Sequence, residues 1–244
     1  MIIDMHMHVD ELPGLGWSMP ASRCIETMDE AGISAAVIMT VTDIPEVNPN
    51  ALELIAGEMT RYPGRLFGFA RIHPWYAESI KVLDRAVLEH GFRGLKLHPV
   101  STLAQPSGAE SMRLIRRAGE LGIPTLFHCG DDPMTTPLAI ADAAARCPEA
   151  QIILGHMGGY GHTDEAIRVA ELHSNIILET SACPYPEKIV EAVARVGAER
   201  VIFGSDGPVC SPVLEVEKIR MCGFSAEDEA LILGDNAQTL LGLS

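Results

Sequence analysis

Histidine and aspartate side chains recur at the ends of short apolar runs in this sequence. His6 and His8 are one residue apart near the start of the chain, and three more such residues end later runs: His128, His156 and Asp206. In a β-strand, side chains at positions i and i+2 point to the same face, so both members of the first pair can reach one ion. Imidazole and carboxylate together are typical ligands of zinc and related divalent ions. Any one of these residues alone could be an ordinary polar strand end, but five at matching positions predict a metal site.

These side chains can meet only if their runs lie in one sheet. Eight apolar runs of strand length alternate with eight stretches whose apolar residues recur every three or four positions, as in amphipathic helices. We predict strands at 2–9, 35–40, 66–73, 94–98, 125–129, 151–156, 175–180 and 201–206, and helices at 22–31, 51–61, 79–89, 110–121, 136–146, 164–172, 187–196 and 212–221. Eight strand-helix units in about 250 residues are typical of an α/β fold, the (β/α)8 or TIM barrel. Nearly every run carries its polar residues at its C-terminal end, where barrels place their chemistry, so the barrel is favoured over a doubly wound open sheet.

The composition limits the class of protein. The 244 residues include 18 Lys and Arg against 33 Asp and Glu, a formal charge of −15, so a nucleic-acid partner is excluded by repulsion. With 47% hydrophobic and 21% charged residues the chain resembles ordinary globular proteins and can bury a sizeable core. We therefore expect one barrel domain over 1–244 that acts on a small molecule.

The sequence says less about the cellular location and the oligomeric state of the protein. The first residues lack the basic segment, apolar stretch and cleavage site of a secretory signal, so we expect a cytoplasmic protein. The apolar runs are far shorter than the roughly 20 residues of a membrane-spanning helix, so no membrane partner is expected. Six cysteines without a C-x-x-C pair predict reduced thiols. A monomer and a homo-oligomer fit the sequence equally well.

Several motifs, in the order in which they occur, resemble the metal-dependent amidohydrolase superfamily. They are Asp4-Met-His-Met-His, Gly94-Leu-Lys-Leu-His-Pro, His128, Gly155-His-Met-Gly-Gly, Phe203-Gly-Ser-Asp and the closing Asp235-Asn-Ala-Gln-Thr-Leu-Leu-Gly-Leu. The resemblance covers essentially the whole chain. It is more narrowly similar to the amidohydrolase-related (amidohydrolase 2) branch, which includes enzymes like aminocarboxymuconate-semialdehyde decarboxylase.

The resemblance implies a divalent metal, with zinc favoured over manganese, iron, nickel or cobalt. The ligands it implies are His6, His8, His128 and Asp206. It also implies that His156 either binds a second ion or acts as a catalytic acid or base. Lys96 lies where binuclear members carry a carbamylated lysine that bridges two ions, and it fits equally well as a cation that binds a substrate carboxylate or pairs with an acid. One or two ions per chain are therefore expected.

Such an ion sets the chemistry. A divalent metal lowers the pKa of bound water from 15.7 to around 7. Asp206 can accept the proton of that water and later deliver it to the leaving group. We expect hydrolysis of an amide, lactone or ester bond in a small carboxylated substrate. The alternative is a decarboxylase in which His156 or an aspartate protonates carbon; a metal-binding protein without turnover is less favoured, because ion storage needs no acid-base pair.

Five side chains are candidates for contact with the substrate. Arg71 and His73 share one face at the end of a predicted strand, and Lys96 and His98 lie at the end of the next one. Trp17 lies in the loop after the first strand, where a barrel enzyme shapes its pocket, although plain loop packing explains a tryptophan there as well. The other four could equally be ordinary polar residues of their strands.

Overall fold

Eight parallel strands form one sheet whose order follows the sequence. The computed structural model describes residues 1–12, 16–45 and 50–243. The strands are β1 (Ile3–His8), β4 (Ala35–Met39), β5 (Leu66–Arg71), β6 (Gly94–Leu97), β7 (Thr125–His128), β8 (Ile152–Gly155), β9 (Ile176–Glu179) and β10 (Val201–Ile202), paired in that order. Each lies within a run predicted from the sequence.

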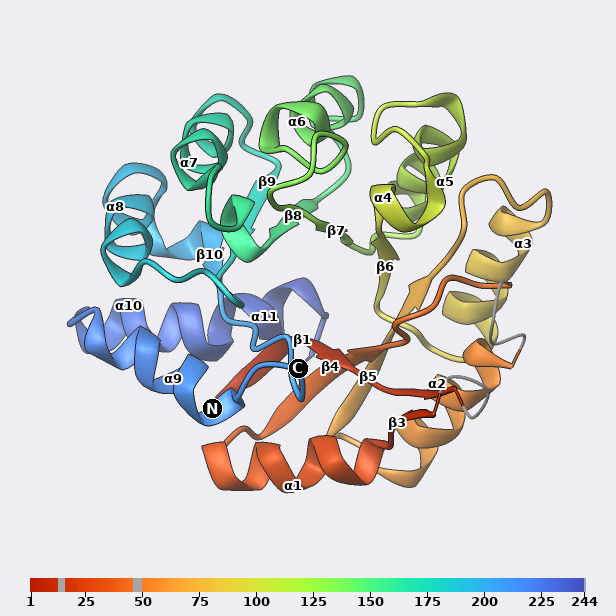
Figure 1. The fold of residues 1–244 in the computed structure, drawn as a ribbon, viewed down its shortest axis with the longest axis horizontal. Helices are drawn as coiled ribbons and strands as arrows, with labels where there is room; N and C mark the ends of the chain where they lie inside the picture. Colours follow the sequence, from red (N-terminus) through yellow and green to blue (C-terminus); the bar gives the residue numbers. More distant parts are fainter. Residues whose placement is uncertain (13–15, 46–49, 244) are drawn as a thin grey trace.

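Helices follow the strands and cover the outside of the sheet. They are α1 (Ala21–Ala31), α2 (Ala51–Arg61), α3 (Ser79–Asp84), α5 (Ala109–Glu120), α6 (Pro137–Arg146), α7 (Thr163–Leu172), α8 (Pro186–Val196) and α9 (Pro212–Met221). Helix α3 continues into a π-helical segment, η2 (Arg85–Glu89). Figure 1 shows the helices around the sheet in chain order, with α1 on the opposite side from α6. The predicted TIM barrel is confirmed.

The first and last strands meet at the seam of the barrel. The backbone N–H of Met5 donates to the carbonyl of Phe203 at 3.1 Å, and the N–H of His8 donates to the carbonyl of Gly207 at 2.7 Å. These bonds nearly close the barrel and place the segment after β10 against β1.

Alternate strand residues divide the core into an outer and an inner cluster. The outer cluster, between sheet and helices, includes Leu95, Phe127 and Leu154. The inner cluster fills the barrel and includes Met5, Val37, Phe69, Leu126, Ile153 and Ile177. A β-carbon at Gly94 would collide with the ring of Phe69, so glycine lets this large side chain fill the interior. Filling by side chains makes the barrel a packed core with no open pore.

Several short elements were not predicted. They are the hairpin strands β2 (Asp10–Leu12) and β3 (Trp17–Met19), the helix α4 (Pro99–Thr102), and the 3-10 turns η3 (His156–Gly158) and η4 (Ala198–Arg200). The C-terminal helices are different, because Ser225 with the acids that follow it predicts a helix start, and a second stretch is expected over Asp235–Leu241. There α10 (Ala226–Ala230), the π-helical η5 (Leu231–Asp235) and α11 (Asn236–Leu240) follow one another, and the Ser225 hydroxyl accepts from the backbone N–H of Asp228. Three or four residues are too few to establish a hydrophobic period, so the sequence pattern misses the shortest of these.

Strand β10 is shorter than the predicted 201–206. The N–H of Phe203 donates to the carbonyl of Ile232 in η5, which takes this residue out of the strand ladder. Asp206 then adopts a positive φ of 57°, a left-handed conformation that a strand cannot continue through. No helix within residues 1–12, 16–45 and 50–243 has both the length and the apolar character to cross a membrane.

Candidate functional site

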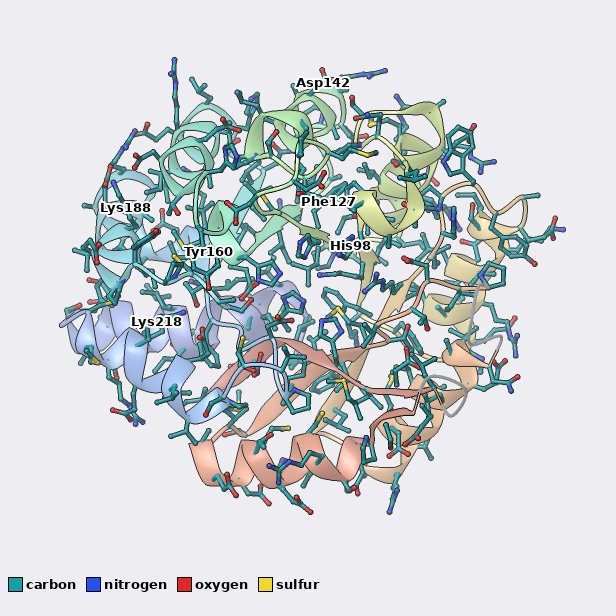
Figure 2. All side chains as sticks on the ribbon, in the orientation of Figure 1. His98, Phe127, Asp142, Tyr160, Lys188 and Lys218 are labelled. Carbon is teal, nitrogen blue, oxygen red and sulfur yellow. The ribbon has the colours of Figure 1, made fainter. Side chains whose placement is uncertain are left out.

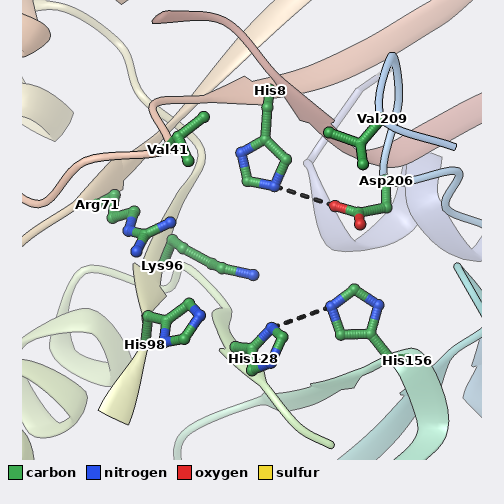
Figure 3. A pocket seen from close by; sticks show the side chains of 9 residues that line it. All are labelled: His8, Val41, Arg71, Lys96, His98, His128, His156, Asp206 and Val209. Atoms are coloured by element: carbon green, nitrogen blue, oxygen red, sulfur yellow. Dashed lines mark hydrogen bonds and ion pairs between the residues drawn. The ribbon is translucent and has the colours of Figure 1, made fainter. Parts of the chain in front are cut away.

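A cavity of about 180 Å³ opens at the C-terminal ends of the strands. It is lined by His8, Val41, Arg71, Lys96, His98, His128, His156, Asp206 and Val209 (Figure 3). These residues come from β1, β5, β6 and β7 and from the segments that follow β4, β6, β8 and β10. TIM-barrel enzymes carry their active sites at this end of the barrel.

The lining forms a polar layer directly above the apolar interior. In β5, Arg71 follows the inner-cluster residue Phe69 by two positions, and in β7, His128 follows Leu126 by two. Because residues two apart in a strand share a face, the strands that fill the barrel also deliver these polar side chains into the cavity.

A β-bulge in β1 turns both histidines of the first pair toward the cavity. Met5 belongs to the inner cluster, so regular alternation would point Met7 inward and His6 and His8 outward. The register against β4 shifts between Asp4 and Met7, with one extra residue in β1. Met7 accordingly packs in the outer cluster, and His8 lines the cavity. Bulges near active sites commonly redirect side chains in this way.

The buried carboxylate of Asp4 supports this bulge. Its Oδ1 accepts hydrogen bonds from the backbone N–H groups of His6 and Ser205, both at 2.9 Å, and its Oδ2 accepts one from the Ser205 hydroxyl. Burial raises the pKa of Asp4 to about 7, against the opposing effect of these hydrogen bonds. Asp4 therefore connects the bulge to the turn that carries Asp206.

Four potential metal ligands lie close together: Asp206, with His6 and His8 across the seam, and His156 after β8. Oδ1 of Asp206 lies 3.1 Å from Nε2 of His8 and 3.6 Å from Nε2 of His6. A ring nitrogen of His156 also lies within 4.8 Å of the ligand atoms of His6 and Asp206. These residues fit a divalent ion by type and by position.

The protonation states suit a metal as well, since bound imidazole must be neutral. Burial lowers the pKa of His6 well below its ordinary value, and it also lowers the pKa of His128 and His156. For Asp206 burial acts the other way, but the hydrogen bond from a histidine and the neighbouring imidazoles bring its pKa below the ordinary value. At neutral pH the site therefore offers imidazole lone pairs and an ionised carboxylate.

The tautomer of His156 follows from its neighbours. Its Nδ1 lies 3.2 Å from the carbonyl oxygen of Ser181 and 2.9 Å from the Ser181 hydroxyl. Because a carbonyl oxygen only accepts, Nδ1 carries the proton and Nε2 bears the lone pair. Nε2 of His156 faces Nδ1 of His128 at 3.1 Å. His128 is therefore the donor in this contact, and Nε2 of His128 is unprotonated.

Lys96 lies at the centre of the site. Its side chain is 1% exposed, and its Nζ lies 3.0 Å from Nε2 of His6. Burial, together with the neighbouring Arg71 cation, lowers the pKa of Lys96 to about 7. Its neutral and charged forms are therefore both populated near neutral pH.

Arg71 is fixed on the cavity wall by a buried ion pair. Its Nε donates to Oδ1 of Asp43 at 3.0 Å and its Nη2 donates to Oδ2 at 3.3 Å. The hydroxyl of Ser101 donates to the same carboxylate at 2.6 Å. A two-point contact of this kind fixes the orientation of the guanidinium plane.

Of the other three residues predicted to contact the substrate, His98 alone is among the described residues that line the cavity. His98 lines the cavity, its ring stacks on that of His128 with centroids 4.1 Å apart, and burial lowers its pKa to about 3. Figure 2 shows His98 toward the middle of the barrel. His73 is not among the lining residues; its Nδ1 accepts from the backbone N–H of Trp75 at 3.3 Å. The backbone of Trp17 lies in β3, but its side chain is outside what the structure describes.

Sequence reasoning missed four residues that support the site: Asp4, Asp43, Glu179 and Ser181. Glu179 ends an apolar run as the histidines do, and Asp4 lies in a motif that was recognised, so a signal existed for both. Asp43 and Ser181 lie in loops, where no periodicity marks a residue.

Comparison with known proteins relates this geometry to a family. A family model described as amidohydrolase matches residues 3–243. A search of the curated proteins finds no match.

Solved structures share the fold at low sequence identity. An uncharacterized TIM-barrel protein from Bordetella bronchiseptica has a TM-score of 0.82 at 19% identity, over 99% of this chain and 98% of that one. A dihydroxybenzoic acid decarboxylase from Polaromonas sp. JS666, with bound manganese and the inhibitor 2-nitroresorcinol, has a TM-score of 0.79 at 19% identity, over 99% and 97%. A candidate 2-pyrone-4,6-dicarboxylic acid hydrolase from Pseudomonas putida has a TM-score of 0.77 at 20% identity, also over 99% and 97%.

Proposed function

The chain belongs to the amidohydrolase family, and from this premise we propose that it is a metal-dependent hydrolase that cleaves an amide, lactone or ester bond of a small carboxylated substrate. The residues that we assign to the ion are His6, His8, His128 and Asp206, with His156 as a ligand of a second ion or a proton acceptor. When bound, a divalent ion supplies Lewis acidity and lowers the pKa of water toward 7.

The contact of His156 Nδ1 with the carbonyl oxygen of Ser181 is the observation that carries this proposal. Its Nδ1 proton is directed at the Ser181 carbonyl, and its lowered pKa leaves Nε2 without a proton at neutral pH. Such an imidazole can accept a proton but has none on the cavity side to give to a carbon atom that loses carbon dioxide. In hydrolysis water supplies the proton, so the tautomer that this contact implies suits that reaction.

We assign proton transfer to Asp206. Its lowered pKa keeps the carboxylate ionised, so it can accept a proton from the attacking water and pass it to the leaving group. The contact at 3.1 Å with Nε2 of His8 orients the carboxylate.

We assign the substrate carboxylate to the wall that carries Arg71 and Lys96. Asp43 engages the Nε and Nη2 side of the Arg71 guanidinium, so Nη1 is the group that we assign to a substrate oxygen. When charged, the Lys96 amine adds a second cation. When neutral, it can add carbon dioxide and release a proton to become a carbamate, whose oxygens would be ligands for a second ion. Metal stoichiometry and the intact mass of the protein separate these two states.

Turnover of a cyclic ester with carboxylates tests the proposal. With 2-pyrone-4,6-dicarboxylic acid and a panel of carboxylated lactones, esters and amides, we expect hydrolysis that needs added Zn²⁺ or Mn²⁺ and stops with a chelator. Asp206→Asn should lower kcat by about 10²- to 10⁴-fold, because it removes the proton acceptor. The matched substitution on the outer helix α6, Asp142→Asn, should leave kcat unchanged.

The rival reaction is a metal-dependent decarboxylation. The likeness to the dihydroxybenzoic acid decarboxylase is the reason to test it alongside hydrolysis. Release of carbon dioxide from a dihydroxybenzoic acid, with no hydrolysis of any member of the panel, would overturn the hydrolase proposal.

A further inference from the structure

Glu179 and Ser181 form a buried pair that contacts two of the site imidazoles from the side away from the cavity. Oε2 of Glu179 lies 3.1 Å from Nδ1 of His6 and 3.2 Å from the backbone nitrogen of His156. The hydroxyl of Ser181 donates to the same oxygen at 2.9 Å and also lies 2.9 Å from Nδ1 of His156. Both side chains are fully buried.

We propose that Glu179 and Ser181 are positioning residues that fix the tautomers of His6 and His156, so that both rings present an unprotonated Nε2 to the cavity. This inference deepens the proposed function and rests on it only for the role of the metal. Metal-bound histidines usually donate their second ring N–H to a carboxylate or carbonyl, and this support raises metal affinity.

The tautomer of His6 follows from the contacts of its two ring nitrogens. Nδ1 faces the carboxylate of Glu179, which only accepts hydrogen bonds when ionised, so Nδ1 is the donor. On the other side, Nε2 lies 3.0 Å from Nζ of Lys96, an amine that donates. The two contacts agree, and the lone pair of His6 is therefore on Nε2.

One carboxylate holds the His6 ring, the His156 backbone and Ser181 together because it receives several donors at once. Oε1 of Glu179 accepts from the backbone N–H of Ser181 at 2.5 Å, while Oε2 accepts from the Ser181 hydroxyl, the His156 backbone and the His6 ring. His8 differs, because its Nδ1 is buried with no hydrogen-bond partner in the part of the chain that the structure describes.

The surrounding backbone leaves room for this carboxylate and little more. A β-carbon at Gly204 would collide with the Glu179 carboxyl group and would come within 3.0 Å of Cβ of His6. Gly204 therefore lets the segment after β10 pass close to Glu179, which fixes the carboxylate between β1, β8 and this segment.

The substitution Glu179→Gln keeps the shape of the side chain but replaces one of its two accepting oxygens with a donating nitrogen. If the amide nitrogen occupies the Oε2 position, it faces the His6 ring, the His156 backbone N–H and the Ser181 hydroxyl. If it occupies the Oε1 position, it faces the backbone N–H of Ser181, which cannot turn away. In the first arrangement His6 regains a favourable contact only by moving its proton to Nε2, where it blocks the metal.

Nitrogen-15 NMR of the metal-free protein reads these tautomers directly. In the wild type we expect the rings of His6 and His156, assigned with His6→Asn and His156→Asn variants, to be protonated at Nδ1. In Glu179→Gln we expect His6 to populate the Nε2-protonated form, and the Kd for Mn²⁺ to rise by about 10- to 100-fold.

Thr180→Val is the matched control, because this buried neighbour has a hydroxyl with no hydrogen-bond partner among the described residues. It should leave the His6 tautomer and Mn²⁺ affinity at their wild-type values. Ser181→Ala is a milder variant for the case in which Glu179→Gln fails to fold, and a smaller rise in Kd is expected because the Ser181 carbonyl still accepts from His156.

An unchanged His6 tautomer with unchanged Mn²⁺ affinity in Glu179→Gln would overturn the proposal. If Glu179→Gln does not fold, unchanged Mn²⁺ affinity in Ser181→Ala would overturn it. The tautomers are measured without metal or substrate. The tautomer result therefore holds even if no hydrolase activity is found. Conversely, an unchanged tautomer in the variant says nothing against the hydrolase activity.

Discussion

At the scale of single residues, burial determines which chemistry the site can perform. An exposed imidazole titrates near pH 6.5 and carries a proton part of the time, whereas the buried rings of His6, His128 and His156 stay neutral. Neutral rings bind metals and accept protons. The same burial lowers the pKa of Lys96 to about 7, so a residue type that is usually charged can also act as an uncharged amine.

This burial predicts that the metal-free protein loses stability in mild acid. Four imidazoles, those of His6, His98, His128 and His156, have folded-state pKa values below the 6.5 of the unfolded chain. Below pH 6.5 the unfolded chain takes up protons that the folded chain does not, so the free energy of unfolding falls as the pH drops toward 3. The raised pKa of Asp4 has the opposite effect, contributing stability that is lost as the pH rises from 3.8 through about 7.

Because four imidazoles oppose only two carboxyl groups, those of Asp4 and Glu215, whose pKa values burial raises, we expect a net loss. The measurement is the thermal unfolding midpoint in a chelating buffer from pH 8 to pH 5. The variant His98→Asn should show a shallower decline than the wild type. A midpoint that stays constant or rises between pH 7 and pH 5 would contradict the assignment of neutral buried rings.

At the scale of elements, the bulge in β1 determines whether the histidine pair reaches the cavity. Asp4 accepts the backbone N–H groups of His6 and Ser205, so Asp4→Ala leaves two buried donors without an acceptor, at a cost of about 1–3 kcal/mol each. We expect a lower urea midpoint and weaker Mn²⁺ binding. Asp4→Asn keeps the accepting oxygen and can donate to the Ser205 hydroxyl, so it should stay close to the wild type in both measurements. Wild-type Mn²⁺ affinity in Asp4→Ala would show that the bulge forms without this carboxylate.

The sequence predicts regular elements well and irregular ones poorly, for a physical reason. A strand such as Ile152–Gly155 is one apolar run in a repeating order, and burial of that run makes it a strand of the barrel. The bulge depends instead on a pairing across the seam, between Asp4 and Ser205, which lie 201 positions apart. The sequence placed His6 and His8 on one shared face correctly, but the alternation from Met5 would have pointed that face outward.

Support residues are hard to predict for a similar reason. Glu179 has the same sequence context as the cavity-lining histidines, and only the three-dimensional contacts distinguish a residue that supports the rings from one that lines the cavity. Asp43 has no periodic context at all, and its role appears only where its carboxylate meets Arg71.

At the scale of the whole molecule, the acidic surface and the cavity are separate. Ion pairs such as Lys188 with Asp164 and Arg195 with Glu171 lie on the outer helices α7 and α8, and Figure 2 shows Lys188 there, away from His98. The cavity carries Arg71 and Lys96 beside Asp206. The formal charge of −15 therefore describes the exterior and is compatible with an anionic substrate.

Metal binding should stabilise the entire barrel. The proposed ligands come from β1, from β7 and from the turn after β10, so an ion joins the two sides of the seam and a third part of the sheet. At a free Mn²⁺ concentration of 100 times Kd, the free energy of unfolding should rise by about 2.7 kcal/mol in a single transition. Urea unfolding with and without Mn²⁺ measures this. The double variant His6→Ala with His8→Ala should show no such gain, and an equal gain in that variant would refute the ligand assignment.

The seam also orders events during synthesis of the chain. A ribosome makes β1, with its histidine pair, long before the turn that carries Asp206, and the barrel cannot close until β10 has followed. The nascent chain therefore carries the imidazoles of β1 that we assign to the metal through most of translation without the carboxylate of that assigned set. On this assignment the complete ligand set exists only in the finished chain, and a truncated product that ends before β10 lacks Asp206.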